Sequence, residues 1–464
     1  MQADNTVKAN DGAATGDVDY GRVLELALEI GVGLLSSGGS VSRVETAVDR
    51  ICSSFGAFEV NVAAFPSMVI ASVRTRDDRE FSFMKRVYSS MNNLAMLEKF
   101  NQLSRDICAK RTGLEEGFRR AFDIAHNKPR DKRLTVLGAG LVSATYSVFF
   151  GGSVTDCLPA FIVAFIMAGL NEVLSSRSLN AYAMTFMLSF IGGLLSISLC
   201  KFFVICGIEC HGSMVMIGSI MILIPGLLIT NAVRDLFTGD LMSGTFQILN
   251  GLLLTVVIAA GYGLSMAVLS GIADFVPITP RTGWEHYVYF LVSGMLGAAS
   301  VCMFFNLNRR RLWWGLFATL LTFGVFIGVS EWLGDADEMV FTVIFIPTLF
   351  AAMTSEVLAR VIKTPATVIL VPAIIALVPG SSLYYTMEAF AAGNIPLALE
   401  NGFVCLMTLL GIAVGVCVAT IAFSLISPVK LHYYKKAKLN LRRRAEKLGR
   451  RESGGENTPD SPKS

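Results

Sequence analysis

The chain has 464 residues, of which 53% are hydrophobic and only 16% are charged, and its mean hydropathy is +0.57. A soluble protein of this length does not carry so apolar a composition, so the sequence predicts a protein that crosses a membrane several times. The net charge of +3 says little about partners, because most of the basic excess lies in one C-terminal tail.

The N-terminal part has the patterns of a small soluble domain. Residues 1–17 are polar and small and are predicted to be disordered. No apolar core with a small-residue cleavage site follows them, so we expect no secretory signal peptide and a cytoplasmic N-terminus. Residues 18–127 show helical and strand periodicity in the order ααβββαα, which predicts a cytoplasmic α+β domain. Its expected elements are a first helix ending at Gly38, a second helix opened by a capping box of Ser42 and Glu45, strands at Phe58–Phe65, Met68–Thr75 and Phe81–Val87, and helices at Asn92–Ala109 and Leu114–Ala125.

Residues 128–428 contain ten apolar stretches, most of them near the ~20 residues that cross a bilayer. Basic residues gather in the connections on the N-terminal side of the membrane, whereas the opposite connections hold only Lys201 and Arg281. This positive-inside asymmetry places both termini in the cytoplasm of a multi-pass cell-membrane protein. Five spans in each half, residues 128–283 and 284–428, make the second half enter the membrane upside down, which predicts an inverted repeat. The expected spans are Leu134–Gly151, Asp156–Leu174, Leu179–Gly207, Ser213–Val233, Leu241–Ser270, Tyr287–Phe305, Leu312–Trp332, Met339–Leu358, Ala366–Tyr385 and Pro396–Ile426.

Residues 429–464 form a basic tail around Arg442–Arg444 directly after the last span. We therefore expect this tail to bind anionic membrane lipids, and we expect no nucleic-acid partner. The nine cysteines lie mostly in apolar stretches without the spacing of a disulfide framework, which predicts reduced thiols. Cys206, Cys210 and His211 do not have the spacing of a zinc site, and we expect neither a metal nor a cofactor.

Two Pro-Gly pairs interrupt apolar stretches at corresponding places in the two halves. Pro225-Gly226 and Pro379-Gly380 are separated by 154 positions. A membrane helix tolerates such a break only where the freed backbone groups face protein or a polar cavity. Broken helices at matching places of two repeats are typical of a transporter's binding site, although a simple kink is the duller alternative. The repeated break therefore predicts a solute transporter.

Several motifs resemble the threonine/serine exporter (ThrE) family. The segment Leu34–Glu45 is similar to the family's opening signature, and Ile224–Gly244 is similar to the motif of its first membrane half. Thr354–Ala366 and Leu377–Gly380 resemble its second half, which some bacteria encode as a separate subunit. The resemblance covers residues 20–426 and implies a cytoplasmic domain fused to about ten membrane helices. It also implies export of hydroxy amino acids driven by the proton gradient. Split relatives are associated with dicarboxylate export, so a succinate-like substrate stays open.

A zwitterionic substrate needs an anion for its ammonium group and hydrogen-bond donors for its carboxylate. The half-helix that starts after each Pro-Gly pair offers free N–H groups and a positive dipole end. Asn231 and the hydroxyl groups of Ser381 and Ser382 follow these starts closely. The candidate substrate-binding residues are therefore Pro225, Gly226, Asn231, Pro379, Gly380, Ser381 and Ser382.

A carboxylate at membrane depth is the usual carrier of a coupling proton. Seven carboxylates in or beside the predicted spans qualify, and none stands out by its depth: Asp156, Glu172, Asp235, Asp240, Glu356, Glu388 and Glu400. The candidates for coupling or gating are Arg234, Asp235, Asp240, Glu356 and Glu388.

Structural interpretations of these charges stay open. Glu356 and Arg360 are four residues apart, so an ion pair within one helix would explain both. Arg234 could extend to the membrane surface without contacting a ligand. In the N-terminal domain, we expect Arg43 and Glu45 to stabilise the fold rather than to catalyse.

Two other functions compete with transport. A membrane-tethered enzyme would have its active site in the N-terminal domain, but His126 is the single histidine there, and neither a nucleophile elbow nor metal-ligand spacing occurs. A passive channel or scaffold would need no coupling carboxylate. We expect the domain to serve regulation or assembly, with the helix at residues 91–110 as the contact of a homo-oligomer.

Overall fold

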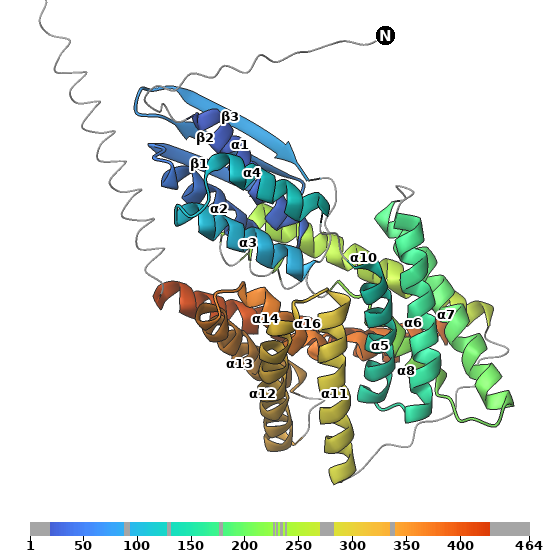
Figure 1. The fold of residues 1–464 in the computed structure, drawn as a ribbon. Helices are drawn as coiled ribbons and strands as arrows, with labels where there is room; N and C mark the ends of the chain where they lie inside the picture. Colours follow the sequence, from blue (N-terminus) through green and yellow to red (C-terminus); the bar gives the residue numbers. More distant parts are fainter. Residues whose placement is uncertain are drawn as a thin grey trace, which may run out of the picture. The chain divides into compact units, whose positions relative to one another are not determined.

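The computed structural model describes residues 19–87, 93–127, 131–175, 180–225, 228, 231–232, 235–236, 239–269, 283–334 and 339–426 (Figure 1). The chain divides into two compact units, Met1–Asp131 and Lys132–Ser464, and each is described by itself. The expected disordered N-terminus (1–17) and the expected lipid-binding tail (429–464) lie outside the described residues.

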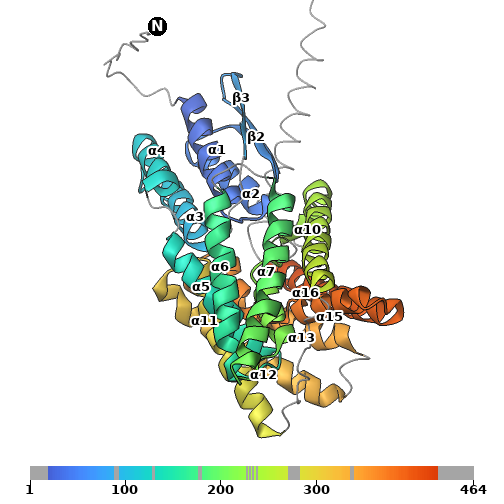
Figure 2. The same ribbon diagram turned by 90° about the vertical axis from the view of Figure 1, so that its right-hand side faces the viewer.

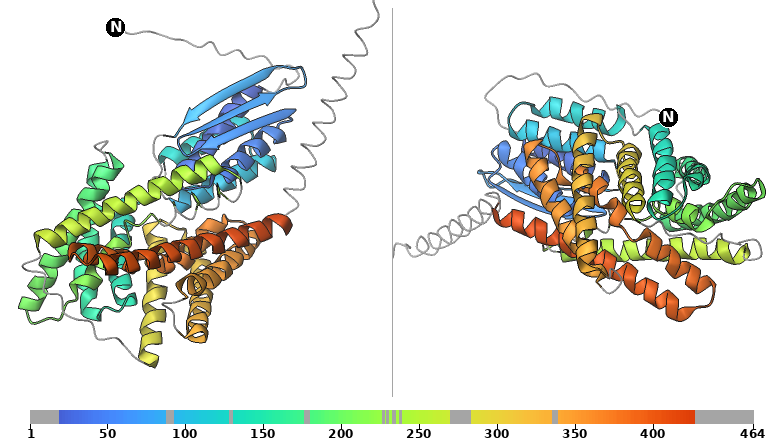
Figure 3. Two further views of the ribbon diagram at one scale, coloured as in Figure 1. Left: turned by 180° about the vertical axis from the view of Figure 1, so that it is seen from behind. Right: turned by 90° about the horizontal axis from the view of Figure 1, so that it is seen from below.

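In the N-terminal unit, helices cover one face of a three-stranded sheet (Figure 3). The strands form an antiparallel meander in the order β1-β2-β3, and each lies within two residues of its expected range. Helices α1 and α2 pack on the sheet, and α3 and α4 pack on α1. The elements are α1 (Tyr20–Ser36), α2 (Val41–Ser54), β1 (Glu59–Phe65), β2 (Met68–Arg74), β3 (Glu80–Arg86), α3 (Leu94–Cys108), α4 (Leu114–Phe122) and a π-helical turn at Asp123–Asn127.

Helix α1 forms the centre of this unit because it is apolar on almost every side. Its buried positions include Leu24, Leu28 and Leu34, none of which is exposed to solvent. Asp19 caps the helix by accepting hydrogen bonds from the N–H groups of Gly21 and Arg22 at 3.0 and 3.2 Å. A helix that is apolar over most of its circumference must be largely enclosed, which is why α1 lies between the sheet and the outer helices.

The expected capping box at the start of α2 is wrong. The helix begins at Val41 with Ser40 as its N-cap, and the Ser40 side chain makes no capping bond. The carboxylate of Glu45 instead accepts the N–H of Ala64 on β1, at 3.0 Å. Because β1 is an edge strand, this N–H has no neighbouring strand to bond, and Glu45 supplies the missing acceptor. On the same helix, burial raises the pKa of the Cys52 thiol to about 12, so the thiol stays protonated at neutral pH.

In the C-terminal unit, all the regular secondary structure of the described residues is helical. In each half, the third long helix packs along the fifth: α7 along α10, and α13 along α16 (Figure 2). The first helices of the two halves, α5 and α11, pack on each other. The helices are α5 (Lys132–Phe149), α6 (Cys157–Leu174), α7 (Ala181–Ile205), α8 (Gly212–Ile220), α10 (Leu241–Val268), α11 (Trp284–Phe304), α12 (Arg309–Leu333), α13 (Val340–Val361), α14 (Ala366–Ile374), α15 (Gly380–Ala391) and α16 (Ile395–Ile426).

Within the described residues, eight helical segments are long and apolar enough to cross a membrane. The segment at Ala366–Ala391 is 89% buried inside the protein, whereas the other seven are only 28–44% buried and expose large apolar side chains. An exposed apolar exterior is expected for helices surrounded by lipid, so the chain is a polytopic helical membrane protein. Two further spans were expected, one over α5 and one at Ser213–Val233, which is described only in part. The count of ten therefore stays a prediction.

The expectation that all cysteines are reduced thiols is wrong. Cys200 and Cys210 form a disulfide, with their Cα atoms 5.4 Å apart. Helix α7 ends at Ile205, and Gly207, with φ of +81°, turns the chain back so that Cys210 meets the last turns of α7. The pairing depends on this turn rather than on cysteine spacing, so the sequence pattern did not reveal it. Among the described residues, no group of His, Cys, Asp and Glu side chains has the arrangement of a metal site.

Candidate functional site at two helix breaks

The second half of the membrane unit contains a break between α14 and α15. Helix α14 ends at Ile374, a short 3-10 turn covers Ile375–Leu377, and α15 begins at Gly380. Between them, Pro379 has φ −74° and ψ 61°, and the N–H of Gly380 bonds the carbonyl of Val378 at 2.7 Å, which makes an inverse γ-turn. Every residue from 371 to 380 is buried, so the break lies inside the protein and not on its surface.

The first half is interrupted at the matching place. Helix α8 ends at Ile220, and the N–H groups of Leu223 and Ile224 return to the carbonyl of Ile220 at 2.9 and 3.2 Å. Pro225 follows in a non-helical conformation, and Asn231, which is buried, is helical again. Gly226 and Arg234 lie outside the described residues.

The two breaks contact each other. A Cβ atom added to Gly380 would lie 2.5 Å from Sδ of Met221 and 3.4 Å from Cδ1 of Ile224. Side chains do not approach so closely, so the contact depends on glycine at this position. Ile224 packs against two core clusters, one formed by α7, α8, α10 and α15 and the other by α12, α13, α14 and α16. The breaks therefore lie at the junction of the two halves.

The first turn of α15 combines backbone donors with polar side chains. Ser381 is half-buried and Ser382 is buried, and the Ser382 hydroxyl donates to the carbonyl of Pro379 at 3.4 Å. The N–H groups at the start of a helix have no acceptor within the helix, so this end carries a partial positive charge. Two turns further on, Glu388 is half-buried and accepts a hydrogen bond from the Tyr384 hydroxyl at 3.4 Å.

Asp235 anchors the far side of the first break. Its side chain is 0% exposed. Its Oδ2 atom accepts hydrogen bonds from Gln247 Nε2 at 2.8 Å and from Ser243 Oγ at 3.2 Å. Both partners lie on α10, and the N–H of Asp240 bonds the Asp235 carbonyl at 2.9 Å. A buried carboxylate with amide and hydroxyl donors can remain charged and can also bind a proton.

The other candidate charges are placed differently. Asp240 is half-buried and is the N-cap of α10, although its side chain makes no capping bond. Glu356 is half-buried on α13, and no hydrogen bond or ion pair among the described residues joins it to Arg360 or to either break. Arg360 instead lies 4.5 Å above the ring of Phe423 and donates to the Phe423 carbonyl at 3.4 Å. The suggested Glu356–Arg360 ion pair is therefore wrong, because α16 offers the guanidinium a better partner.

Two buried hydroxyl groups on α5 were missed by the sequence analysis. Ser143 and Tyr146 are 0% exposed, and neither hydroxyl has a hydrogen-bond partner among the described residues. Ser143 Oγ would lie 3.1 Å from a Cβ on Gly218 of α8, and the Tyr146 hydroxyl 3.3 Å from a Cβ on Gly297 of α11. An unpaired buried hydroxyl costs about 1–3 kcal/mol, so such groups call for a partner beyond the described residues. Their spacing of three residues on one helical face was the available signal.

Comparison with known proteins decides the family. A family model described as "Putative threonine/serine exporter" matches residues 25–269, which is more than half of the chain. The chain belongs to the threonine/serine exporter family. A second model, "Threonine/Serine exporter, ThrE", matches residues 290–422. The threonine/serine exporter of Corynebacterium glutamicum is 23% identical over 428 residues, which cover 89% of this chain and 85% of that protein. No solved structure matches the chain.

Membership in the threonine/serine exporter family groups the chain with transporters rather than with enzymes. The first model includes the break after α8, and the second includes the break before α15. Both halves of the exporter family are therefore fused in this single chain, in agreement with the resemblance described above.

Proposed function

We propose that this protein is a secondary active exporter of small polar solutes, with threonine and serine as its substrates, driven by a proton gradient across the cell membrane. The observation that carries the proposal is the buried contact between the two helix breaks at Gly380 and Met221. Where interrupted helices meet inside a membrane protein, their backbone N–H and C=O groups are free to bind a substrate.

The packing of the two halves supports alternating access by an inverted repeat. Helix α7 packs along α10 as α13 packs along α16, and the broken spans α8 and α14 each lie against the first three helices of their own half. The interrupted span of the second half also crosses over, since α15 packs on α8 and α10. Two halves with the same packing but opposite direction can exchange conformations, and the exchange moves the access path from one side of the membrane to the other. We assign the cytoplasmic side to both termini.

The residue roles follow from charge. In our proposal, the N-terminus of α15 with Ser381 and Ser382 receives the substrate carboxylate, because its free N–H groups and positive dipole end favour an anion. Asn231 bonds either end of the amino acid. Asp235 carries the coupling proton, since among the candidates for coupling or gating it is the carboxylate with no exposed surface, while Arg234, Asp240, Glu356 and Glu388 serve gating.

Flux measurements test the function. Proteoliposomes loaded with threonine, serine, alanine or succinate should release threonine and serine in a saturable manner, and faster when the interior is made alkaline at constant external pH. The Pro379→Ala/Gly380→Leu variant should lose this efflux, because the leucine would occupy the space of Met221. Release of succinate alone would replace the substrate with a dicarboxylate. Absence of gradient-dependent flux from folded protein would contradict the proposal and favour an enzyme, a channel or a scaffold.

Removing the Tyr146 hydroxyl should weaken substrate affinity without weakening the fold. Tyr146→Phe deletes a hydroxyl that has no partner among the described residues, so the melting temperature should stay the same or rise. If the hydroxyl bonds the substrate, its loss removes about 1 kcal/mol of binding, and the KM for threonine should increase about fivefold.

The matched control is Tyr262→Phe. The Tyr262 hydroxyl bonds the Ser219 hydroxyl at 2.7 Å, so its removal should lower the melting temperature and leave the KM nearly unchanged. An unchanged KM in the Tyr146→Phe variant would remove this hydroxyl from the binding site.

A further inference from the structure

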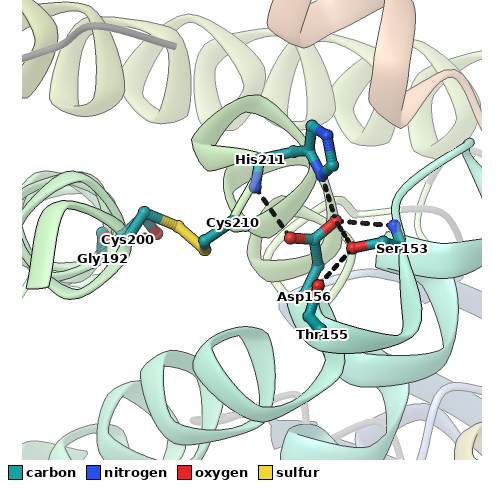
Figure 4. The surroundings of a disulfide bond; sticks show 8 residues. Ser153, Thr155, Asp156, Gly192, Cys200, Cys210 and His211 are labelled. Carbon is teal, nitrogen blue, oxygen red and sulfur yellow. Dashed lines mark hydrogen bonds and ion pairs between the residues drawn. A yellow bond between two sulfur atoms is a disulfide. The ribbon is translucent and has the colours of Figure 1, made fainter. Parts of the chain in front are cut away.

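A second fully buried carboxylate lies at the connection between α5 and α6 (Figure 4). Asp156, immediately before α6, is 0% exposed. Its oxygens accept hydrogen bonds from the N–H of Ser153 at 2.7 Å and from the Ser153 hydroxyl at 3.1 Å. They also accept the N–H of His211 at 2.7 Å and face its Nδ1 atom at 2.9 Å.

These bonds join two separate helix connections. Ser153 and Asp156 lie between α5 and α6, whereas His211 lies between α7 and α8. The disulfide between Cys200 and Cys210 fixes the residue before His211 to the end of α7 (Figure 4). The disulfide thus positions the imidazole, and the Asp156–His211 contact holds the ends of the two helical hairpins together.

Among the described ionisable side chains around Asp156, the His211 imidazole is the one that can balance the charge of the carboxylate. The sequence of α8 carries no charged residue, and the charged residues of α5 and α6 lie at the opposite ends of those helices. Cys157 donates its thiol to the carbonyl of Ala144 at 3.4 Å. Glu209 is exposed and Lys201 is half-buried on the α7 side. A buried carboxylate is costly unless it is paired, and the His211 imidazole is the group that faces Asp156.

We propose that Asp156 and His211 form a proton-operated latch that closes the external ends of the two hairpins. Because Nδ1 faces Asp156, the proton enters at Nε2, and the side chain is 11% exposed for this purpose. The neutral imidazole donates from Nδ1 to the carboxylate. The carboxylate already makes this bond charge-assisted, and protonation of the imidazole adds the attraction between two opposite charges. External acid therefore favours the closed external end.

The inference rests on the proposed transport function, and an exchange assay separates the two. Threonine exchange at saturating substrate on both sides needs no net driving force, so pH acts on it only through groups of the protein. In right-side-out vesicles, lowering the external pH from about 8 to about 6 should slow wild-type exchange about threefold or more, because the latch must open for exchange.

His211→Asn is the decisive variant, since the asparagine amide can donate to Asp156 from nearly the position of Nδ1 but cannot bind a proton at neutral pH. Its exchange should be normal at about pH 8 and should change less than about 1.5-fold at about pH 6. His286→Asn is the matched control, because His286 is exposed near the start of α11, at the same side of the membrane in our orientation. It should keep the wild-type response. If His211→Asn does not fold, Asp156→Asn gives the same test by removing the negative charge.

The possible results separate clearly. A wild-type pH response that survives in both His211→Asn and Asp156→Asn, or a response to internal instead of external pH, overturns the latch. A wild-type protein that exchanges threonine at a rate independent of external pH also overturns it. A wild-type protein that exchanges no solute at all contradicts the proposed function instead.

Discussion

Replacing Gly138 by leucine should eliminate transport and destabilise the membrane unit. A Cβ atom at this position would lie 2.6 Å from the backbone nitrogen of Phe304 and 2.8 Å from its Cα atom. Backbone atoms cannot move aside as the end of a flexible side chain can, so α5 and α11 would have to separate. Overpacking a close-packed core costs about 1–3 kcal/mol, and a clash with backbone lies at the upper end of that range.

The measurement combines exchange flux with thermal unfolding in detergent. We expect the Gly138→Leu variant to retain less than about one tenth of the wild-type flux and to melt at a lower temperature. Gly169→Leu on α6 is the matched control, because a Cβ at Gly169 has no atom within 4 Å and faces open space. Normal flux and melting in the Gly138→Leu variant would show that the close approach of α5 and α11 is dispensable.

This interface matters because it joins the two halves of the membrane unit. Helices α5 and α11 are the first helices of the two halves, and Tyr146 packs against Gly297 at the same contact. In the proposed alternating-access cycle, the two halves move relative to each other. Glycines at this contact permit the close approach of the two helices, so we propose it as the pivot of that motion.

Features that depend on local backbone chemistry could be predicted from the sequence. The strands of the N-terminal unit follow from β-rich runs separated by Pro66 and by Asp77-Asp78, and the structure has them within two residues. The breaks at Pro225 and Pro379 were visible for a similar reason, since proline lacks the N–H that a helix needs.

Features that depend on distant partners could not be predicted. Glu45 looked like a capping residue, yet it bonds a strand residue 19 positions away. Arg360 looked like the partner of Glu356, yet it packs on Phe423 of the last helix. Asp156 and His211 are 55 positions apart, and only the turn after α7 brings them together. A single sequence contains each of these side chains but not the fold that selects its partner.

Replacing Asp235 by asparagine should uncouple transport from the proton gradient. The asparagine side chain can still accept hydrogen bonds from Gln247 and Ser243, so the link to α10 is kept. It cannot bind and release a proton. Efflux driven by an alkaline interior should therefore fall at least about tenfold, towards the rate measured without a pH gradient. Threonine exchange at equal pH on both sides should stay within about twofold of the wild-type rate.

The comparison of gradient-driven efflux with exchange at equal pH distinguishes a coupling role of Asp235 from a structural one. A purely structural carboxylate would lower exchange and driven efflux together, because both need the same folded path. Glu400→Gln is the matched control, since Glu400 is exposed near the start of α16 and has no role in the proposal, and both flux modes of this variant should remain near wild type. If driven efflux persists in Asp235→Asn at unchanged exchange, the coupling proton resides on another carboxylate. Glu388 at the second break becomes the next to replace, because it is half-buried and, like Asp235, accepts a hydrogen bond from a hydroxyl group.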